Sequence, residues 1–142
     1  MPVESLDHLN LATRDLAVSR RFYSEVVGLV EGERPPFNRA GAWMYAHERP
    51  VLHLSTGRQP TPDHTGPFNH VAFLASGLDG LRERLRMHGV SFEEFAVPEQ
   101  GMHQVFFRDP DGTQVEMIYT GEEADRARRE GARVDATLSG TV

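Results

Sequence analysis

The 142-residue sequence contains no cysteine and no lysine. The absence of cysteine excludes disulfides, thiolate metal sites and cysteine nucleophiles. The absence of lysine excludes a lysine Schiff base, since all fifteen basic residues are arginine. Any metal that this chain binds must therefore be held by nitrogen and oxygen ligands.

The sequence also lacks an excess of positive charge and long apolar runs. Its net charge of −6 and pI near 5.6 provide no basic surface for a polyanion, so no nucleic-acid partner is expected. No stretch approaches the length of a membrane span, and the N-terminus lacks the pattern of a signal peptide. With 39% hydrophobic and 25% charged residues, we expect a globular, cytoplasmic protein without membrane contact.

The sequence contains an internal repeat. The stretch 6-LDHLNLAT-13 has a near-copy in 68-FNHVAFLA-75, with a histidine at the same place in each. Each copy reads as a strand with its histidine in the middle, and each is followed by an amphipathic helical pattern that ends at a glycine, over 16–28 and 78–89. The two halves of the chain therefore begin with the same strand and helix.

Short strand-like runs follow each helix, at 29–33, 42–47 and 51–56 in the first half and at 90–97, 103–108 and 113–119 in the second. The turn 109-DPDG-112 joins the last two. We predict one domain over 1–142 with two β-α-β-β-β modules. These are module 1 at about 4–56, a linker at 57–67, module 2 at about 68–120 and a tail at 121–142, whose charged helical start we expect to be peripheral and solvent-facing.

Alternation of side chains along the strands predicts which residues lie on the face away from the helices. His8 and Asn10 should face away from Leu9 and Leu11, which pack on the helices. By the same alternation, Glu116 faces away from the apolar set of the last strand. The matching positions of the two modules thus carry His8, His53, His70 and Glu116.

This residue set suits a divalent metal. Neutral imidazole and carboxylate ligands bind Fe, Ni, Mn, Zn or Co, and two histidines with one carboxylate leave coordination positions open for a substrate. Taken alone, a strand histidine is typical of a hydrogen-bonded core residue and a strand glutamate of a solvent-facing one. Their matched positions in a repeat favour a shared metal ion.

Three segments, DHLNLATRDLAVSRRFYSEVVGL, NHVAFLASGLDGLRERLRMHGV and VFFRDPDGTQVEM, resemble the vicinal oxygen chelate superfamily of glyoxalases, extradiol dioxygenases, fosfomycin-resistance enzymes and bleomycin-binding proteins. The resemblance extends over roughly 6–119. It implies an α+β fold in which two tandem βαβββ modules form a curled eight-stranded mixed sheet around a metal cavity. It also implies one divalent metal per site held by His8, His70 and Glu116. His53 falls where glyoxalase I has a fourth ligand, so it would bind the metal or act as an acid or base.

Departures from the family pattern narrow the expected activity. Extradiol dioxygenases usually have tyrosine where this chain has Phe106 and a histidine several residues upstream, where positions 97–99 hold none. The fosfomycin enzymes also commonly have that tyrosine, with a lysine- or serine-lined anion site nearby, and this chain has no lysine. Bleomycin-binding proteins are expected to lose the metal ligands, which are present here. We therefore expect a glyoxalase-like lyase or isomerase acting on a small substrate that chelates the metal through adjacent oxygens. The alternatives are an Fe(II)-dependent ring-cleaving dioxygenase and a non-catalytic sequestering or resistance protein.

The resemblance also suggests roles for the remaining site residues. Glu116 or His53 would move the proton, while Asn10, Gln104 and Phe106 would orient the substrate. Trp43 and Tyr45 would form apolar walls or, equally, pack within the sheet. Members of the superfamily close the cavity within one chain or across a two-fold dimer, and we expect a homodimer because open sheet edges need cover.

Overall fold

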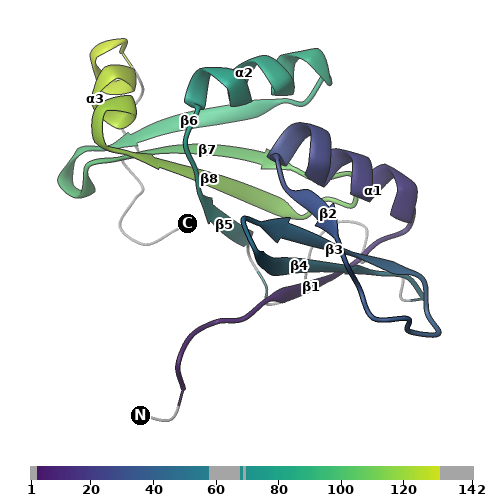
Figure 1. Ribbon diagram of the computed structural model, residues 1–142. Helices are drawn as coiled ribbons and strands as arrows, with labels where there is room; N and C mark the ends of the chain where they lie inside the picture. The colour runs from purple at the N-terminus through teal and green to yellow at the C-terminus, as the bar shows by residue number, and fades with distance from the viewer. Residues whose placement is uncertain (1–2, 58–67, 69, 132–142) are drawn as a thin grey trace. The chain divides into compact units, whose positions relative to one another are not determined.

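The computed structural model describes residues 3–57, 68 and 70–131. The chain divides into two compact units, Met1–Pro62 and Asp63–Val142. Each unit contains the predicted succession of one strand, one helix and three strands, so the α+β fold with two tandem modules is confirmed. The eight strands form two four-stranded mixed sheets, one in each unit (Figure 1).

The first unit contains β1 (Leu9–Ala12), α1 (Leu16–Phe22), β2 (Val30–Gly32), β3 (Gly41–Ala46) and β4 (Arg49–Ser55). Its strands lie in the order β1-β4-β3-β2, with β1 parallel to β4 and the other pairs antiparallel. One face of the sheet packs with α1 and the turn after it to form the core. This core includes Leu11, Tyr23, Val26, Met44, Leu52 and Leu54.

Local signals in the sequence explain the helix of this unit. The side chain of Asp15 accepts a hydrogen bond from the backbone N–H of Val18 (3.1 Å), as expected of an N-cap. The predicted helix over 16–28 becomes α1 followed by a π-helical turn, Tyr23–Val27. Gly28 ends it with a φ of 96°, a left-handed conformation that glycine adopts at little cost.

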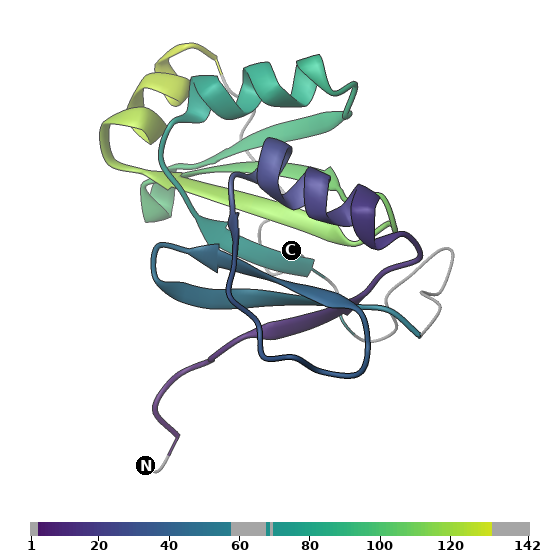
Figure 2. The same ribbon diagram turned by 45° about the vertical axis from the view of Figure 1, so that its right-hand side comes forward.

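The second unit contains β5 (His70–Leu74), α2 (Leu78–Met87), β6 (Phe92–Val97), a 3-10 turn (Pro98–Gln100), β7 (Met102–Arg108), β8 (Gln114–Thr120) and α3 (Gly121–Arg129). Its strand order, β5-β8-β7-β6, repeats that of the first unit, again with one parallel pair. Helices α2 and α3 lie on the same face of this sheet (Figure 2). The opposite face is the one that carries Glu116.

The structure differs from the prediction at the start of β1. The first repeat was expected to place His8 in the middle of a strand, but β1 begins at Leu9 and His8 precedes it. The side chain of His8 is 39% exposed. The histidine therefore belongs to the segment that leads into the sheet.

The structure also differs from the expectation that the charged helical segment after residue 120 is peripheral and solvent-facing. The predicted helix is present as α3, and its Ala124 and Ala127 are buried. The carboxylate of Glu123 accepts hydrogen bonds from the backbone N–H groups of Gly77 (3.0 Å) and Leu78 (2.8 Å). It therefore caps α2, whose own N-cap position, Gly77, has no side chain to do so. Small buried residues and a capping carboxylate make α3 part of the second unit.

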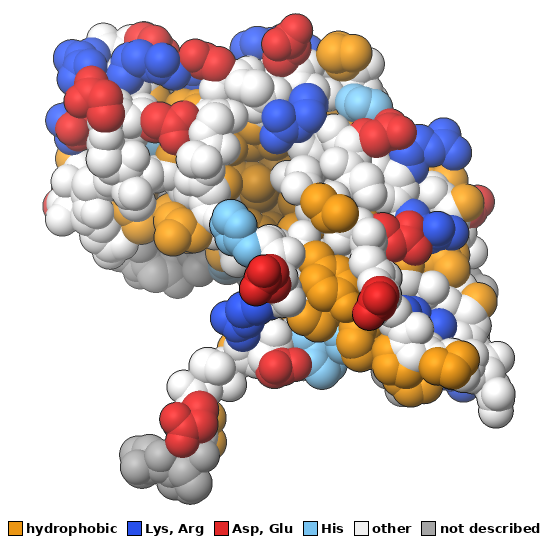
Figure 3. All heavy atoms as spheres, viewed as in Figure 1, with side chains coloured by type: hydrophobic (Ala, Val, Ile, Leu, Met, Phe, Trp, Pro, Cys, Tyr) orange, Lys and Arg blue, Asp and Glu red, His pale blue; other side chains and the backbone are white. Residues whose placement is uncertain are grey.

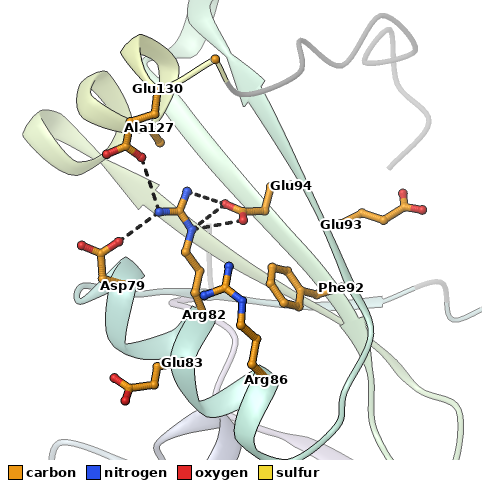
Figure 4. A pocket seen from close by; sticks show the side chains of 10 residues that line it. Asp79, Arg82, Glu83, Arg86, Phe92, Glu93, Glu94, Ala127 and Glu130 are labelled. Atoms are coloured by element: carbon orange, nitrogen blue, oxygen red, sulfur yellow. Dashed lines mark hydrogen bonds and ion pairs between the residues drawn. The ribbon is translucent and has the colours of Figure 1, made fainter.

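Charged side chains of both signs are interspersed over α2 and α3 (Figure 3). Arg82 contacts Asp79 (3.0 Å), Glu94 (2.8 Å) and Glu130 (3.6 Å) beside a pocket of about 770 Å³ (Figure 4). The fully buried His103 contacts the same Glu94 carboxylate through its Nε2 at 2.6 Å. Burial would raise the pKa of Glu94, but hydrogen bonds with His103 and Arg82 outweigh burial and lower the pKa to about 2.

No helix of the described residues is long and apolar enough to cross a membrane.

Replacing Glu123 with Ala should lower the free energy of unfolding by about 1–2 kcal/mol, because two N–H groups at the start of α2 lose a charged acceptor. The measurement is urea denaturation followed by circular dichroism. Glu122→Ala is the matched control, since the Glu122 side chain is 81% exposed and pairs with Arg129 at the surface. Equal effects of the two substitutions would contradict the capping role.

Glu94 should make stability fall on acidification. Its pKa in the folded protein, about 2, lies below the ordinary glutamate value of 4.5, so its contribution is complete above pH 4.5 and is lost as the pH falls toward 2. Glu94→Gln should cost about 1–3 kcal/mol at pH 7, with a smaller difference from the wild type near pH 2. The exposed neighbour Glu93→Gln is the control, and a cost for Glu94→Gln that is independent of pH would contradict the assignment.

Candidate metal and substrate site

In the first unit, strand register brings three of the predicted site residues to one face. His53 on β4 pairs with Asn10 on β1 and with Trp43 on β3. The neighbouring positions Leu52 and Leu54 are buried on the opposite, helix-covered face. The alternation predicted from the sequence thus holds for these strands.

The side chains of this face form a stack of rings. The His8 and His53 ring centroids are 3.8 Å apart with planes inclined by 16°, and those of Trp43 and His53 are 4.1 Å apart with planes inclined by 8°. Phe37 approaches the outer side of Trp43 with a centroid distance of 6.2 Å. His53 is therefore held between two flat side chains.

The His8 ring has a carboxylate partner. Its Nδ1 lies 2.8 Å from an oxygen of Asp7, and this hydrogen bond lowers the pKa of Asp7. Metal-binding histidines commonly donate one ring N–H to a carboxylate, which leaves the other nitrogen free to bind the ion. Asp7 thus favours the tautomer of His8 that presents Nε2 as a ligand. The sequence signal for it was the acidic residue directly before the histidine, which sequence reasoning did not use.

The His53 ring has an unsatisfied nitrogen. Its Nε2 is buried and has no hydrogen-bond partner among the described residues. Burial and the neighbouring His8 lower the pKa of His53, while a hydrogen bond to the backbone of Pro50 acts in the opposite direction. A neutral imidazole with a free Nε2 is able to bind a cation or accept a proton.

In the second unit, His70 and Glu116 lie side by side. The His70 Nε2 is 3.3 Å from an oxygen of Glu116, whose side chain is 5% exposed. Burial raises the pKa of Glu116, and His70 together with a hydrogen bond from Gln104 opposes that shift. A bound cation would favour the ionised carboxylate in the same way.

Gln104 and Phe106 complete this second group. Gln104 is 4% exposed, and its Oε1 has no hydrogen-bond partner among the described residues. Phe106 on β7 is directly opposite Glu116 on β8. The Phe106 ring also contacts the His70 ring edge to face, with the two ring centroids 6.5 Å apart. A pocket of about 550 Å³ also reaches Phe106 from β6. Both predicted substrate-orienting residues of this unit therefore surround its two predicted ligands.

Asn10 and Tyr45 make hydrogen bonds within the first unit. The Asn10 Oδ1 accepts from the Ser55 hydroxyl at 2.7 Å, and the Tyr45 hydroxyl donates to the Glu33 carbonyl at 2.6 Å. The Tyr45 ring lies over Gly32, where a Cβ atom added to the glycine would approach it to 2.7 Å. Tyr45 is held by local contacts. These fit the second alternative given for it from the sequence, packing within the sheet.

The donor chemistry of both pairs fits a divalent cation. Within the described residues, no group of three or more histidine or carboxylate side chains is placed to hold a metal ion. The predicted ligands instead occur as His8 with His53 in one unit and His70 with Glu116 in the other. The Asp7 contact of His8 and the buried Glu116 carboxylate fit a cation as a further partner, and the free Nε2 of His53 fits either a cation or a proton.

The sequence is similar to known proteins over most of its length. Residues 5–117 match the model of the Glyoxalase/Bleomycin resistance protein/Dioxygenase superfamily. The chain belongs to this superfamily.

Three of the curated relatives are named as enzymes of different classes. A glutathione transferase, FosA of Serratia marcescens, is 32% identical over 127 residues, which are 87% of this chain and 86% of the relative. A metallothiol transferase, FosB of Lysinibacillus sphaericus, is 28% identical, with 89% of each chain covered. A lactoylglutathione lyase of Schizosaccharomyces pombe is 26% identical over 97% of this chain and 55% of the relative.

Solved structures agree on the fold. A glyoxylase/bleomycin resistance protein/dioxygenase domain from Frankia superposes with a TM-score of 0.68 at 24% identity, over 84% of this chain and 99% of that one. The fosfomycin resistance protein FosX of Listeria monocytogenes superposes with a TM-score of 0.67 at 18% identity, over 86% and 98% of the two chains. At these identities the likeness concerns the fold.

Replacing Gly32 with Ala should destabilise the first unit by about 1–3 kcal/mol, because the added methyl group meets the hydrogen-bonded Tyr45 ring. Gly80→Ala in α2 is the matched control. There the Cβ meets only the flexible end of Arg84 at 3.2 Å, and alanine should stabilise the helix by about 0.5–1 kcal/mol. Thermal unfolding should give shifts of opposite sign, and a neutral Gly32→Ala would contradict the close approach of Tyr45.

Proposed function

We propose that this protein is a divalent-metal-dependent enzyme, a glyoxalase-like lyase or isomerase, whose small substrate chelates the metal through adjacent oxygens. His8, His70 and Glu116 would hold the metal. The observation that carries the proposal is the buried Glu116 carboxylate beside the His70 Nε2 at 3.3 Å, where an imidazole and an amide offset the burial only in part. When bound, the cation supplies a Lewis acid that polarises a substrate oxygen.

The residues of the chain supply proton transfer and orientation. The lowered pKa of His53 favours a neutral ring that is able to accept a proton at Nε2. The resulting imidazolium would keep its hydrogen bond to the backbone of Pro50. Glu116 is the second group able to move a proton when its carboxylate is displaced from the metal, because burial then raises its pKa.

The free Oε1 of Gln104 would accept a hydrogen bond from the substrate, since a buried acceptor without a partner is costly. Phe106 offers an apolar surface beside His70 and excludes water from that side. Asn10 and Trp43 would contact the substrate from the first unit. A homodimer is our proposed assembly, since open sheet edges need cover and symmetric pairing provides it.

Transfer of a thiol to a substrate is the second candidate, because the FosA and FosB relatives are named as transferases. This chain has Phe106 where fosfomycin enzymes commonly have tyrosine, and it has no lysine, which argues against fosfomycin itself as the substrate. The two candidates differ in the bonds that change: a thiol transferase joins the thiol sulfur to a carbon of an electrophile such as an epoxide, whose C–O bond breaks, whereas a glyoxalase-like isomerase rearranges a hemithioacetal that already contains the thiol into a thioester. Loss of free thiol with epoxides indicates transfer, and formation of a thioester from a hemithioacetal indicates isomerisation. Oxygen uptake with catechols would instead indicate a dioxygenase, and tight binding without turnover a sequestering protein.

Removal of any one of the three proposed ligands should reduce metal binding. We expect His8→Ala, His70→Ala and Glu116→Ala to weaken Zn(II), Ni(II) or Co(II) binding by more than the roughly 10–100-fold typical of outer contacts. The measurement is isothermal titration calorimetry after treatment with a chelator. The exposed His88→Ala is the control. Unchanged metal stoichiometry and affinity in Glu116→Ala would refute the proposal.

A further inference from the structure

The ring stack of the first unit restricts how its two histidines can act. The planes of His8 and His53 are inclined by only 16° at a centroid distance of 3.8 Å. A metal ion lies close to the plane of each imidazole that binds it, because the nitrogen lone pair lies in that plane. Two planes so nearly parallel meet only at a distance several times the metal–nitrogen bond length of about 2 Å. One ion cannot be bound by both rings while they remain stacked.

His8 is the better ligand of the two. Its Nδ1 contacts the Asp7 carboxylate at 2.8 Å, the arrangement that orients a metal-binding imidazole. The His53 ring instead has a hydrogen bond with the backbone of Pro50. Both faces of that ring are covered, by His8 on one side and Trp43 on the other. Rotation of the His53 ring therefore requires one of these side chains to move.

Trp43 is itself supported on its outer side. Phe37 approaches it at 6.2 Å, and the Arg34 guanidinium lies over the Phe37 ring at 4.9 Å. Strand register also fixes the pair, since Trp43 and His53 are directly opposite each other on β3 and β4. A planar side chain at this position has little freedom to leave the His53 ring.

We propose that Trp43 is a positioning residue, which clamps His53 against His8 and so keeps His53 off the metal, with its Nε2 left as a proton acceptor. This inference rests on the proposed metal site and assigns one of the two roles that the sequence left open for His53. The centre would then have three protein ligands, and His53 would act as a neighbouring group.

Co(II) binding to the full-length protein tests the inference without a substrate, because the visible spectrum of Co(II) reports its coordination number. His53→Ala should leave the affinity and the spectrum as in the wild type. Trp43→Ala should free His53 to rotate onto the ion, with weaker visible absorption and an affinity raised at least roughly tenfold, since even an outer contact of a metal site changes the affinity by about 10–100-fold. Trp43→Phe should behave as the wild type because it preserves a flat ring.

The double variant Trp43→Ala with His53→Ala is the decisive control. It should restore the wild-type spectrum, since the ring that Trp43→Ala releases is then absent. A loss of Co(II) affinity in His53→Ala alone, or a Trp43→Ala variant with unchanged affinity and spectrum, would overturn the inference. Failure of the metal site itself gives a different result, in which the wild type does not bind Co(II) or His8→Ala binds it equally well.

Discussion

The burial of a carboxylate is the constraint on which the rest of the second unit depends. Glu116 lies on β8 at a position where alternation directs it away from the helices, and it is 4% exposed. An acidic group in such a place needs compensation, which His70 and Gln104 provide in part. The turn at 109–112 fixes the register that brings it there, since Asp109 accepts hydrogen bonds from the N–H groups of Asp111 and Thr113. A cation would complete the compensation.

Periodicity explains why most of the fold could be predicted from the sequence. Two copies of one pattern, each a strand, a helix ended by glycine and three short strands, predict two modules with the same topology. The faces of the strands followed from alternation, which directed Glu116 away from the apolar side chains of its strand. The structure adds the register, in which His53 is opposite Asn10 and Glu116 is opposite Phe106. Features that depend on contacts between distant segments could not be predicted. The packing of α3 depends on two alanines and on Glu123, residues whose composition is equally typical of a solvated helix.

The sequence predicted which residues form the candidate site, but not how their side chains are arranged. The repeat identified His8, His53, His70 and Glu116, but it gave no information about ring orientation. The stack of His8, His53 and Trp43 depends on side-chain torsions and on the course of the segment before β1, where His8 lies outside the strand. Asp7 was missed because its role follows from a side-chain contact with its neighbour. Membership of the superfamily does not by itself identify the activity, since the curated relatives include both transferases and a lyase.

The capping of α2 by Glu123 has a consequence for how the protein is made. The carboxylate that completes the start of a helix at residue 78 belongs to a residue 45 positions later in the chain. On the ribosome, the strands of the first unit emerge first, and within the described residues they pair only with one another. The second unit lacks this cap until its C-terminal helix has left the exit tunnel. We therefore expect the first unit to fold before the second during translation.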